Sequence, residues 1–326
     1  MYQVINKTTG NKFKVNKDNI LNSALKEGLF LPYGCQKGLC GKCKAFIVSG
    51  EVSNITPNNA ITKEEIDNNI TLLCQCYAKS DLEIEIQELA TRIPPSSKKN
   101  MKIKEINALN YDVFELVLEQ SKENKISFLA GQYANLSYKK YIDRPFSIAN
   151  TPNDDFISFH IKVVKGGGFT NLLANDLKIG ENIEIEGPKG SFYFNEQSTN
   201  PIIMVAGGTG LGPIKAIIEY IIKHQLKRKI TLYWGVNTQD DFYLDIPKEW
   251  LEKITFIPVL SNPKKNWHGR IGFVHQAVLD DISDLSNYDI YVCGAPIMVK
   301  TANETFIEKG LKIENFFSDS FEINTK

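Results

Sequence analysis

The residues most suited to chemistry are four cysteines in the first part of the sequence. Cys35, Cys40 and Cys43 are separated by four and two residues, and Cys74 follows after a longer interval. This spacing is typical of 2Fe–2S centres, in which four thiolates are shared by two irons. The sequence therefore predicts a one-electron redox centre in this segment.

Disulfides and a structural zinc ion are the alternatives for these cysteines. Disulfides are uncommon in a reducing compartment. Zinc sites usually combine two short C-x₂-C pairs, whereas this segment has one. Gly34, Gly38 and Gly41 would let the backbone wrap closely and direct its amides at sulfur. We interpret the neighbouring Cys76 as a packing residue.

A second group of candidates is Arg144-Pro145-Phe146-Ser147, which could bind a flavin dinucleotide. A guanidinium can hold a pyrophosphate through two hydrogen bonds. The Phe146 ring can lie along the isoalloxazine, and the Ser147 hydroxyl can donate a hydrogen bond where hydride arrives. The alternative is an ordinary barrel strand that carries a surface arginine.

Two glycine-rich segments offer backbone amides to phosphates. Gly167 and Gly168 end a strand, and Thr170 lies at the start of a helix. Gly207-Gly208-Thr209-Gly210 links an apolar strand to a helix near Pro213. Amides at a helix N-terminus bind phosphate, and glycines permit its close approach. Neither a G-x-G-x-x-G pattern nor a P-loop lysine is present, so the pattern alone does not identify the nucleotide.

The elements that position these residues fall into three segments. Residues 1–92 open with a hairpin and a helix, for which Asp18 is the predicted N-cap. Residues 93–100 are rich in proline, serine and lysine and are interpreted as a linker. Residues 101–198 are mostly strand-like with glycine turns, which predicts a small antiparallel barrel. Residues 199–326 alternate strands and helices, which predicts a parallel sheet covered on both faces.

Composition excludes several other classes of protein. The 326 residues contain 38 basic and 38 acidic side chains, a balance that gives no support for nucleic-acid binding. The most apolar window, residues 202–222, is interrupted by glycines, a proline and charged residues, so we expect no membrane span. The first residues lack a basic and apolar signal segment, which favours the cytoplasm.

The first segment resembles a known family. Residues 32–52 closely resemble the cluster loop of plant-type ferredoxins, and residues 72–86 resemble their second cysteine segment. The resemblance covers nearly all of residues 1–92. It implies an α+β ferredoxin domain of the β-grasp type, whose 2Fe–2S ligands are the four cysteines named above.

The middle segment resembles the FAD-binding barrel of the ferredoxin–NADP reductase superfamily. The arginine segment, the glycines before Thr170 and residues 187–192 have the order and spacing of that barrel. The resemblance implies that the strand with Ile161 and Lys162 runs beside the flavin. The family usually has tyrosine where Phe146 stands, so this chain keeps the ring and lacks the hydroxyl.

The last segment resembles the NAD-binding domain of the same superfamily. The resemblance is carried by the glycine loop at 207–210, by residues 233–235, by residues 268–272 and by residues 293–298. It implies that Cys293 lies near the nicotinamide and acts in catalysis with Ser147, although a core cysteine is the alternative. The implied nucleotide-binding residues are Gly207, Gly208, Thr209, Gly210, Pro213, Gly235, Asn237, Cys293, Gly294 and Met298.

Two further expectations concern the cofactors of this last segment. A C-terminal aromatic residue often covers the flavin in this superfamily, which makes Phe317 and Phe321 candidates. The loop at 235–241 has two aspartates and no basic residue to meet a 2′-phosphate, so we expect NADH to be preferred to NADPH. Lys264 and Lys265 in the next loop are the evidence against this preference.

In this order, the three segments resemble the reductase components of aromatic-ring and phenol oxygenases, and the reductase that serves a deoxysugar dehydrase. The resemblance implies an oxidoreductase that passes electrons from NADH through FAD and the 2Fe–2S cluster to a partner protein. We expect it to be a monomer. One alternative is a stand-alone diaphorase or flavin reductase that acts on small acceptors, and another is a redox sensor.

Overall fold

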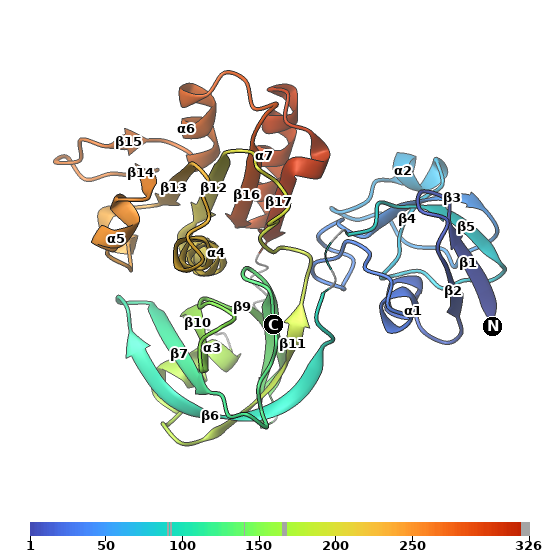
Figure 1. Cartoon of the computed structure of the whole chain (residues 1–326), viewed down its shortest axis with the longest axis horizontal. Helices are drawn as coiled ribbons and strands as arrows, with labels where there is room; N and C mark the ends of the chain where they lie inside the picture. Colours follow the sequence, from blue (N-terminus) through green and yellow to red (C-terminus); the bar gives the residue numbers. More distant parts are fainter. Residues whose placement is uncertain (90, 92, 140, 165–167, 321–326) are drawn as a thin grey trace. The chain divides into compact units, whose positions relative to one another are not determined.

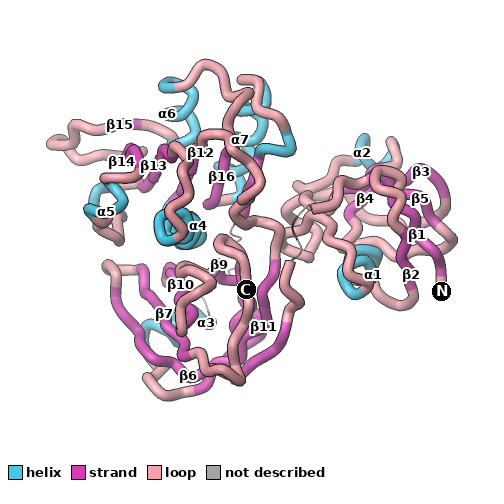
Figure 2. Tube along the Cα trace, in the orientation of Figure 1, coloured by secondary structure: helices cyan, strands magenta, loops and turns pink. Residues whose placement is uncertain are grey.

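The protein is described here by a computed structural model, which covers the chain except residues 90, 92, 140, 165–167 and 321–326. The side chains of residues 141–143 are also outside the description. The chain divides into two compact units, Met1–Ile93 and Pro94–Lys326. Figure 1 shows their elements in chain order, and Figure 2 separates helices from strands by colour.

The first unit is built on one five-stranded sheet. Its strand order is β2-β1-β5-β3-β4, in which β1 and β5 are parallel and the other neighbours are antiparallel. Side chains alternate between faces, so Val4, Leu82 and Ile84 are buried while Glu85 is exposed. The elements are β1 (Tyr2–Asn6), β2 (Lys12–Val15), α1 (Ile20–Lys26), β3 (Lys44–Ser49), α2 (Lys63–Asp67), β4 (Ile70–Leu72) and β5 (Leu82–Glu85).

The start of α1 differs from the prediction. Asn19, and not Asp18, is the N-cap, because its side-chain oxygen accepts a hydrogen bond from the amide of Asn22 at 2.8 Å. Asp18 instead forms an ion pair with Lys26 at 2.6 Å. Both residue types are good caps, so sequence preference did not distinguish these adjacent positions.

The second unit begins with the antiparallel barrel predicted for the middle segment. Its sheet order is β10-β7-β6-β11-β8-β9, and Ile148 bridges Phe159 beyond β9, which brings the two edge strands together. The barrel core includes Leu116, Phe159 and Ile185. The elements are β6 (Ser97–Ala108), β7 (Val113–Glu119), β8 (Tyr133–Tyr138), β9 (Tyr141–Ser147), β10 (Phe156–Lys162), α3 (Gly168–Asn175) and β11 (Asn182–Lys189).

The rest of the unit is a parallel sheet in the order β15-β14-β13-β12-β16-β17. Alternate residues of β12 enter different cores, since Met204 packs on the α4 side and Val205 on the side of α6 and α7. Figure 1 shows these helices on opposite faces. The strands are β12 (Ile202–Gly207), β13 (Ile230–Val236), β14 (Ile254–Leu260), β15 (Arg270–Ile271), β16 (Asp289–Gly294) and β17 (Phe316–Ser320).

The helices of this sheet domain complete the predicted alternation of strand and helix. They are α4 (Leu211–Lys223), α5 (Lys248–Leu251), α6 (Val274–Asp281) and α7 (Pro296–Glu308). Three short 3₁₀ turns occupy Gly208–Gly210, Gln239–Asp241 and Ile313–Asn315. The predicted fold class is therefore confirmed in all three segments of the chain.

Candidate redox and nucleotide-binding sites

The four candidate iron ligands lie on two segments that the first sheet holds together. Cys43 directly precedes β3, and Cys74 follows β4. These strands pair with Lys44 opposite Leu72, and the amide of Leu73 donates to the carbonyl of Cys43 at 3.0 Å. Strand pairing therefore brings the distant Cys74 to the loop that carries the other three cysteines.

The four sulfur atoms fall into two hydrogen-bonded pairs. The hydrogen bond with Cys40 is the main cause that lowers the pKa of Cys35 to about 5, and the hydrogen bond with Cys43 is the main cause that lowers the pKa of Cys74 to about 7. The same two hydrogen bonds raise the pKa values of Cys40 and Cys43. One thiol of each pair is therefore favoured as the thiolate, which is the form that binds metals, while its partner retains the shared proton. Within the described chain, no three His, Cys, Asp or Glu side chains are gathered around one metal position. Two pairs of sulfur atoms match a 2Fe–2S centre, in which four thiolates are shared by two irons.

Backbone amides surround the sulfur atoms, as the glycines in the loop predict. The amides of Lys37 and Leu39 each donate to Cys35 Sγ at 3.3 Å, and the Cys35 amide donates to Cys40 Sγ at 3.4 Å. Gly38 has a φ of +78°, and a Cβ there would lie 2.6 Å from Gln75 Cγ. The loop can therefore close over the sulfurs because a glycine occupies this position.

Cys76 is separate from these pairs. Its side chain is fully buried, and burial raises its pKa to about 12. A buried neutral thiol behaves as a small apolar side chain, which is consistent with a packing role.

The candidate flavin site lies on the barrel strand β9 and the helix beside it. Arg144 is half-buried on β9, and α3 packs against that strand. The rings of Phe146 and Phe169 are 5.4 Å apart. A guanidinium and the first amides of α3 thus come from adjacent elements, and donors of these two kinds fit a dinucleotide pyrophosphate. Gly167 lies outside the described residues.

Ser147 links the barrel to the nucleotide-binding sheet. Its buried hydroxyl is 3.2 Å from Asp319 Oδ2 on β17. Asp319 is in register with Cys293 on the neighbouring strand β16. Asp319, which the sequence reasoning did not identify, therefore contacts one predicted catalytic residue and lies on the strand next to the other.

The other barrel candidates have different environments. Ile161 is buried in the barrel core, and the Thr170 hydroxyl accepts a hydrogen bond from the Val164 amide at 3.2 Å. Lys162 instead lines a cavity together with Gly208 and Thr209 of the glycine loop at 207–210, which we call the phosphate loop. Of the C-terminal aromatics, Phe317 stacks on Tyr291 with ring centroids 4.6 Å apart. Phe321 lies outside the described residues.

The phosphate loop needs its glycines because other backbone segments lie against it. A Cβ at Gly210 would be 2.1 Å from the carbonyl oxygen of Cys293, and a Cβ at Gly207 would be 2.6 Å from Met298 Sδ. A Cβ at Gly235 would lie 2.6 Å from Val274. Close approach of β16, α6 and α7 therefore accounts for these glycines.

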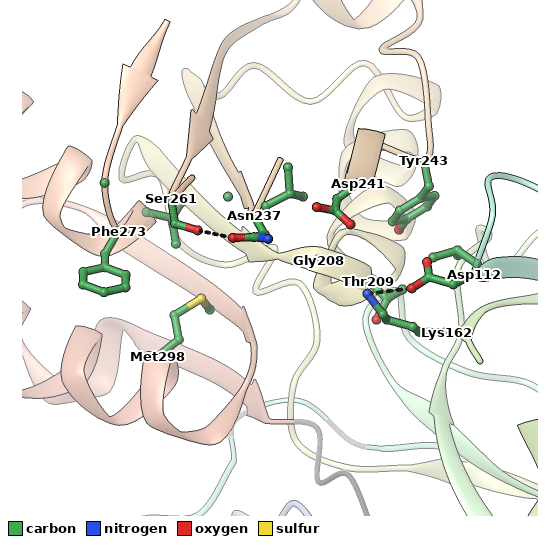
Figure 3. Close-up of a pocket in the computed structure, with 15 residues that line it drawn as sticks. Asp112, Lys162, Gly208, Thr209, Asn237, Asp241, Tyr243, Ser261, Phe273 and Met298 are labelled. Atoms are coloured by element: carbon green, nitrogen blue, oxygen red, sulfur yellow. Dashed lines mark hydrogen bonds and ion pairs between the residues drawn. The ribbon is translucent and has the colours of Figure 1, made fainter. Parts of the chain in front are cut away.

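A cavity of about 280 Å³ brings many of the nucleotide-binding candidates together. Figure 3 shows side chains from the barrel and from the sheet domain around it. Asn237 accepts a hydrogen bond from the Ser261 hydroxyl at 3.3 Å on one side of the cavity. Cys293 and Gly294 end β16 behind the loop, and Pro213 is buried in the first turn of α4. The candidates that line the cavity are Lys162, Gly208, Thr209, Gly235, Asn237 and Met298.

The sequence reasoning also missed a buried polar cluster beside this cavity. His160 Nδ1 lies 3.2 Å from the hydroxyl of Tyr243, which lines the cavity. The other ring nitrogen of His160, Nε2, lies 3.8 Å from Glu115 Oε1. Burial lowers the pKa of His160, so the neutral imidazole is favoured. A histidine between two apolar strand residues carries no local signal of these distant partners.

Comparisons with known proteins identify the domains in which these candidate sites lie. Three protein families match in sequence: the 2Fe-2S iron-sulfur cluster binding domain at residues 5–79, the oxidoreductase FAD-binding domain at 100–194 and the oxidoreductase NAD-binding domain at 204–304. The CDP-6-deoxy-L-threo-D-glycero-4-hexulose-3-dehydrase reductase of Yersinia pestis is 38% identical, covering 93% of this chain and 92% of that protein. The chain belongs to the iron–sulfur flavoprotein reductases.

Other members of this family are similar over nearly the whole chain. Reductase component 1 of terephthalate 1,2-dioxygenase from Comamonas sp. is 32% identical, with 93% of this chain and 92% of that protein covered. The crystal structure of the Amycolatopsis cytochrome P450 reductase GcoB has a TM-score of 0.81 at 26% identity, and covers 98% of this chain and 99% of its own. The ferredoxin reductase of carbazole 1,9a-dioxygenase has a TM-score of 0.73 at 29% identity, with 98% of each chain covered.

The family establishes the enzyme class and the cofactors. This reductase is an oxidoreductase with domains for a 2Fe–2S cluster, FAD and NAD, as predicted. Among the helices that the structure describes, none combines the length and apolar character needed to cross a membrane.

Proposed function

We propose that this reductase takes electrons from NADH and delivers them singly to a partner protein. The observation that carries the proposal is the hydrogen bond from Ser147 of the barrel to Asp319 of the nucleotide-binding sheet, where Asp319 is in register with Cys293. Residues that serve a flavin and residues that serve a nicotinamide are expected to meet where hydride passes between the two.

The cofactors divide the electron chemistry between them, since bound FAD accepts a hydride and releases electrons singly, and a 2Fe–2S cluster carries one electron at a time. The residues of this chain supply binding and orientation. Arg144 and the amides at the start of α3 hold the flavin pyrophosphate, and Cys35, Cys40, Cys43 and Cys74 hold the irons.

Ser147 and Asp319 are also placed to accept the proton that the reaction releases. One hydride arrives and two electrons leave in each turnover, so one proton must be released. The Ser147 hydroxyl can donate to Asp319 Oδ2, and this carboxylate is half-buried on β17. We infer that this pair carries the proton away from the flavin.

The proposed partner is an enzyme that consumes single electrons. A dehydrase of a nucleotide-linked 6-deoxyhexulose is the first candidate, because dehydrase reductases are 38% identical to this chain while the terephthalate dioxygenase reductase is 32% identical. An oxygenase component is the second. We also expect a monomer in the cytoplasm, where thiols remain reduced; light scattering and cell fractionation test these two expectations.

A cluster-ligand variant tests the proposed route of the electrons. Cys40→Ala removes one thiolate, so the cluster should be lost while hydride transfer to FAD remains. Ferricyanide can take electrons directly from flavin and should be reduced at near the wild-type rate. Cytochrome c, which stands in for a protein acceptor, should lose most of its reduction. NADH consumption with each acceptor, measured side by side, gives both rates.

The alternative enzyme would respond differently to the same change. A diaphorase that acts on small acceptors does not need the cluster as an exit. Cytochrome c reduction that survives Cys40→Ala undiminished would therefore favour that alternative. Steady NADH turnover with ferricyanide would exclude redox sensing as the sole function of the chain.

A further inference from the structure

One positively charged side chain of the barrel, Lys162, lines the cavity at the phosphate loop. Asp112, Val113 and Lys162 line it from the barrel side, and Gly208 and Thr209 line it from the start of the α4 segment. Figure 3 shows Lys162 and Asp112 next to Thr209. A side chain of the flavin domain therefore reaches the place where the nucleotide's phosphates are expected.

This cation is already paired in the structure. Lys162 Nζ lies 3.0 Å from Asp112 Oδ2, with the lysine side chain half exposed and the aspartate side chain 22% exposed. The cavity contains one other charged residue among those described, Asp241. Asp241 accepts hydrogen bonds from the amide and hydroxyl of Thr238 and from the hydroxyl of Tyr111. The charged side chains of the cavity thus sum to one excess negative charge.

An excess negative charge opposes a pyrophosphate, which carries two negative charges. The loop amides and the N-terminus of the 13-residue helix α4 favour this group. Lys162 would favour it too, but its ammonium cannot pair fully with Asp112 and with phosphate oxygens at the same time. A lysine is suited to exchange between two anions, because its charge is compact and its stem is flexible.

We propose that Asp112 is an internal competitor that holds Lys162 until the nucleotide pyrophosphate displaces it. The exchange avoids an unpaired cation in the empty cavity, and it lowers the affinity for the nucleotide, so NAD⁺ leaves more readily after hydride transfer. The proposal rests on the proposed function only in taking this cavity as the nucleotide site.

The test removes the negative charge of Asp112 and measures binding without turnover. ADP-ribose, which contains the pyrophosphate and lacks the nicotinamide, is titrated calorimetrically into the full-length protein with FAD and iron bound. Asp112→Asn should bind it about three- to tenfold more tightly, as expected for one charge removed near a partly exposed anion. Adenosine, which has no phosphate, should bind both proteins equally. Asp176→Asn, which changes an exposed barrel aspartate, is the matched control and should leave both affinities unchanged.

A double-mutant cycle with Lys162→Met shows whether the effect passes through this lysine. Lys162→Met alone should weaken ADP-ribose binding, and in that background Asp112→Asn should bring little further gain. Unchanged or weaker binding by Asp112→Asn, or a full gain that persists without Lys162, overturns the proposal while leaving the nucleotide site intact. If ADP-ribose does not bind the wild-type protein, the nucleotide assignment of the cavity fails and the proposal fails with it.

Discussion

The guanidinium of Arg144 combines a permanent charge with a planar set of donors. It is half-buried on β9, which packs against the helix α3. A lysine would keep the charge and lose the paired donors, so the two residue types differ in geometry rather than in net charge.

Arg144→Lys should therefore weaken the binding of FAD. A hydrogen bond to a charged group contributes about 1.5–3 kcal/mol, hence a roughly ten- to over a hundredfold loss of affinity. Flavin fluorescence on titrating the apoprotein with FAD measures this. Arg270→Lys, in the nucleotide-binding sheet, is a control that should leave the FAD affinity unchanged. Equal FAD affinity in Arg144→Lys and the wild type would remove Arg144 from the site.

Among the elements, the loop between β13 and α5 is the one that we expect to select between NADH and NADPH. It carries Asp240 and Asp241 and contains no basic residue between 235 and 241. Lys264 in the following loop could meet a 2′-phosphate, but its Nζ lies 2.6 Å from Asp240 Oδ2. Lys264, one of the two lysines that favoured NADPH, is therefore already paired with Asp240. Lys265, the other lysine, is exposed and could still meet a 2′-phosphate.

We therefore expect NADH to be preferred to NADPH, because the carboxylates of this loop repel a 2′-phosphate. The measurement is kcat/KM with both nucleotides under the same salt conditions. Asp240→Asn, which frees Lys264, should raise the relative efficiency with NADPH. A tenfold advantage for NADPH in the wild-type protein would show that the pocket selects for the phosphate.

In the whole molecule, the cluster and the flavin belong to separate compact units. The cysteines lie in Met1–Ile93, and the barrel and the nucleotide-binding sheet lie in Pro94–Lys326. Each unit has its own buried side chains, so damage to one metal ligand should not unfold the flavin site.

Cys43→Ala should consequently lose its iron and keep its FAD. The wild-type protein should contain about two irons per chain, as a single 2Fe–2S centre requires. Iron and flavin contents of the purified proteins provide the measurement. Cys76→Ala is the matched control, because it removes a buried thiol outside the two sulfur pairs and should retain iron. Loss of FAD together with iron in Cys43→Ala would contradict the independence of the units.

Features that depend on residues close together in the chain could be predicted from the sequence. The cysteine spacing predicted a 2Fe–2S centre, and the glycine loop at 207–210 and the arginine segment at 144–147 predicted their cofactors once their resemblance to the reductase superfamily was added. The alternation of apolar and polar residues predicted strands, because side chains on one face of a strand recur at every second residue.

Contacts between residues that are distant in the chain could not be predicted in this way. Ser147 and Asp319 are 172 positions apart, and they meet because β17 lies beside β16 at the barrel. His160 and Tyr243 are 83 positions apart, and Asp112 and Lys162 meet because their segments lie side by side in the β7–β10 sheet. A hydrogen bond or ion pair between distant residues depends on packing that brings them together, and no local pattern of sequence records that packing.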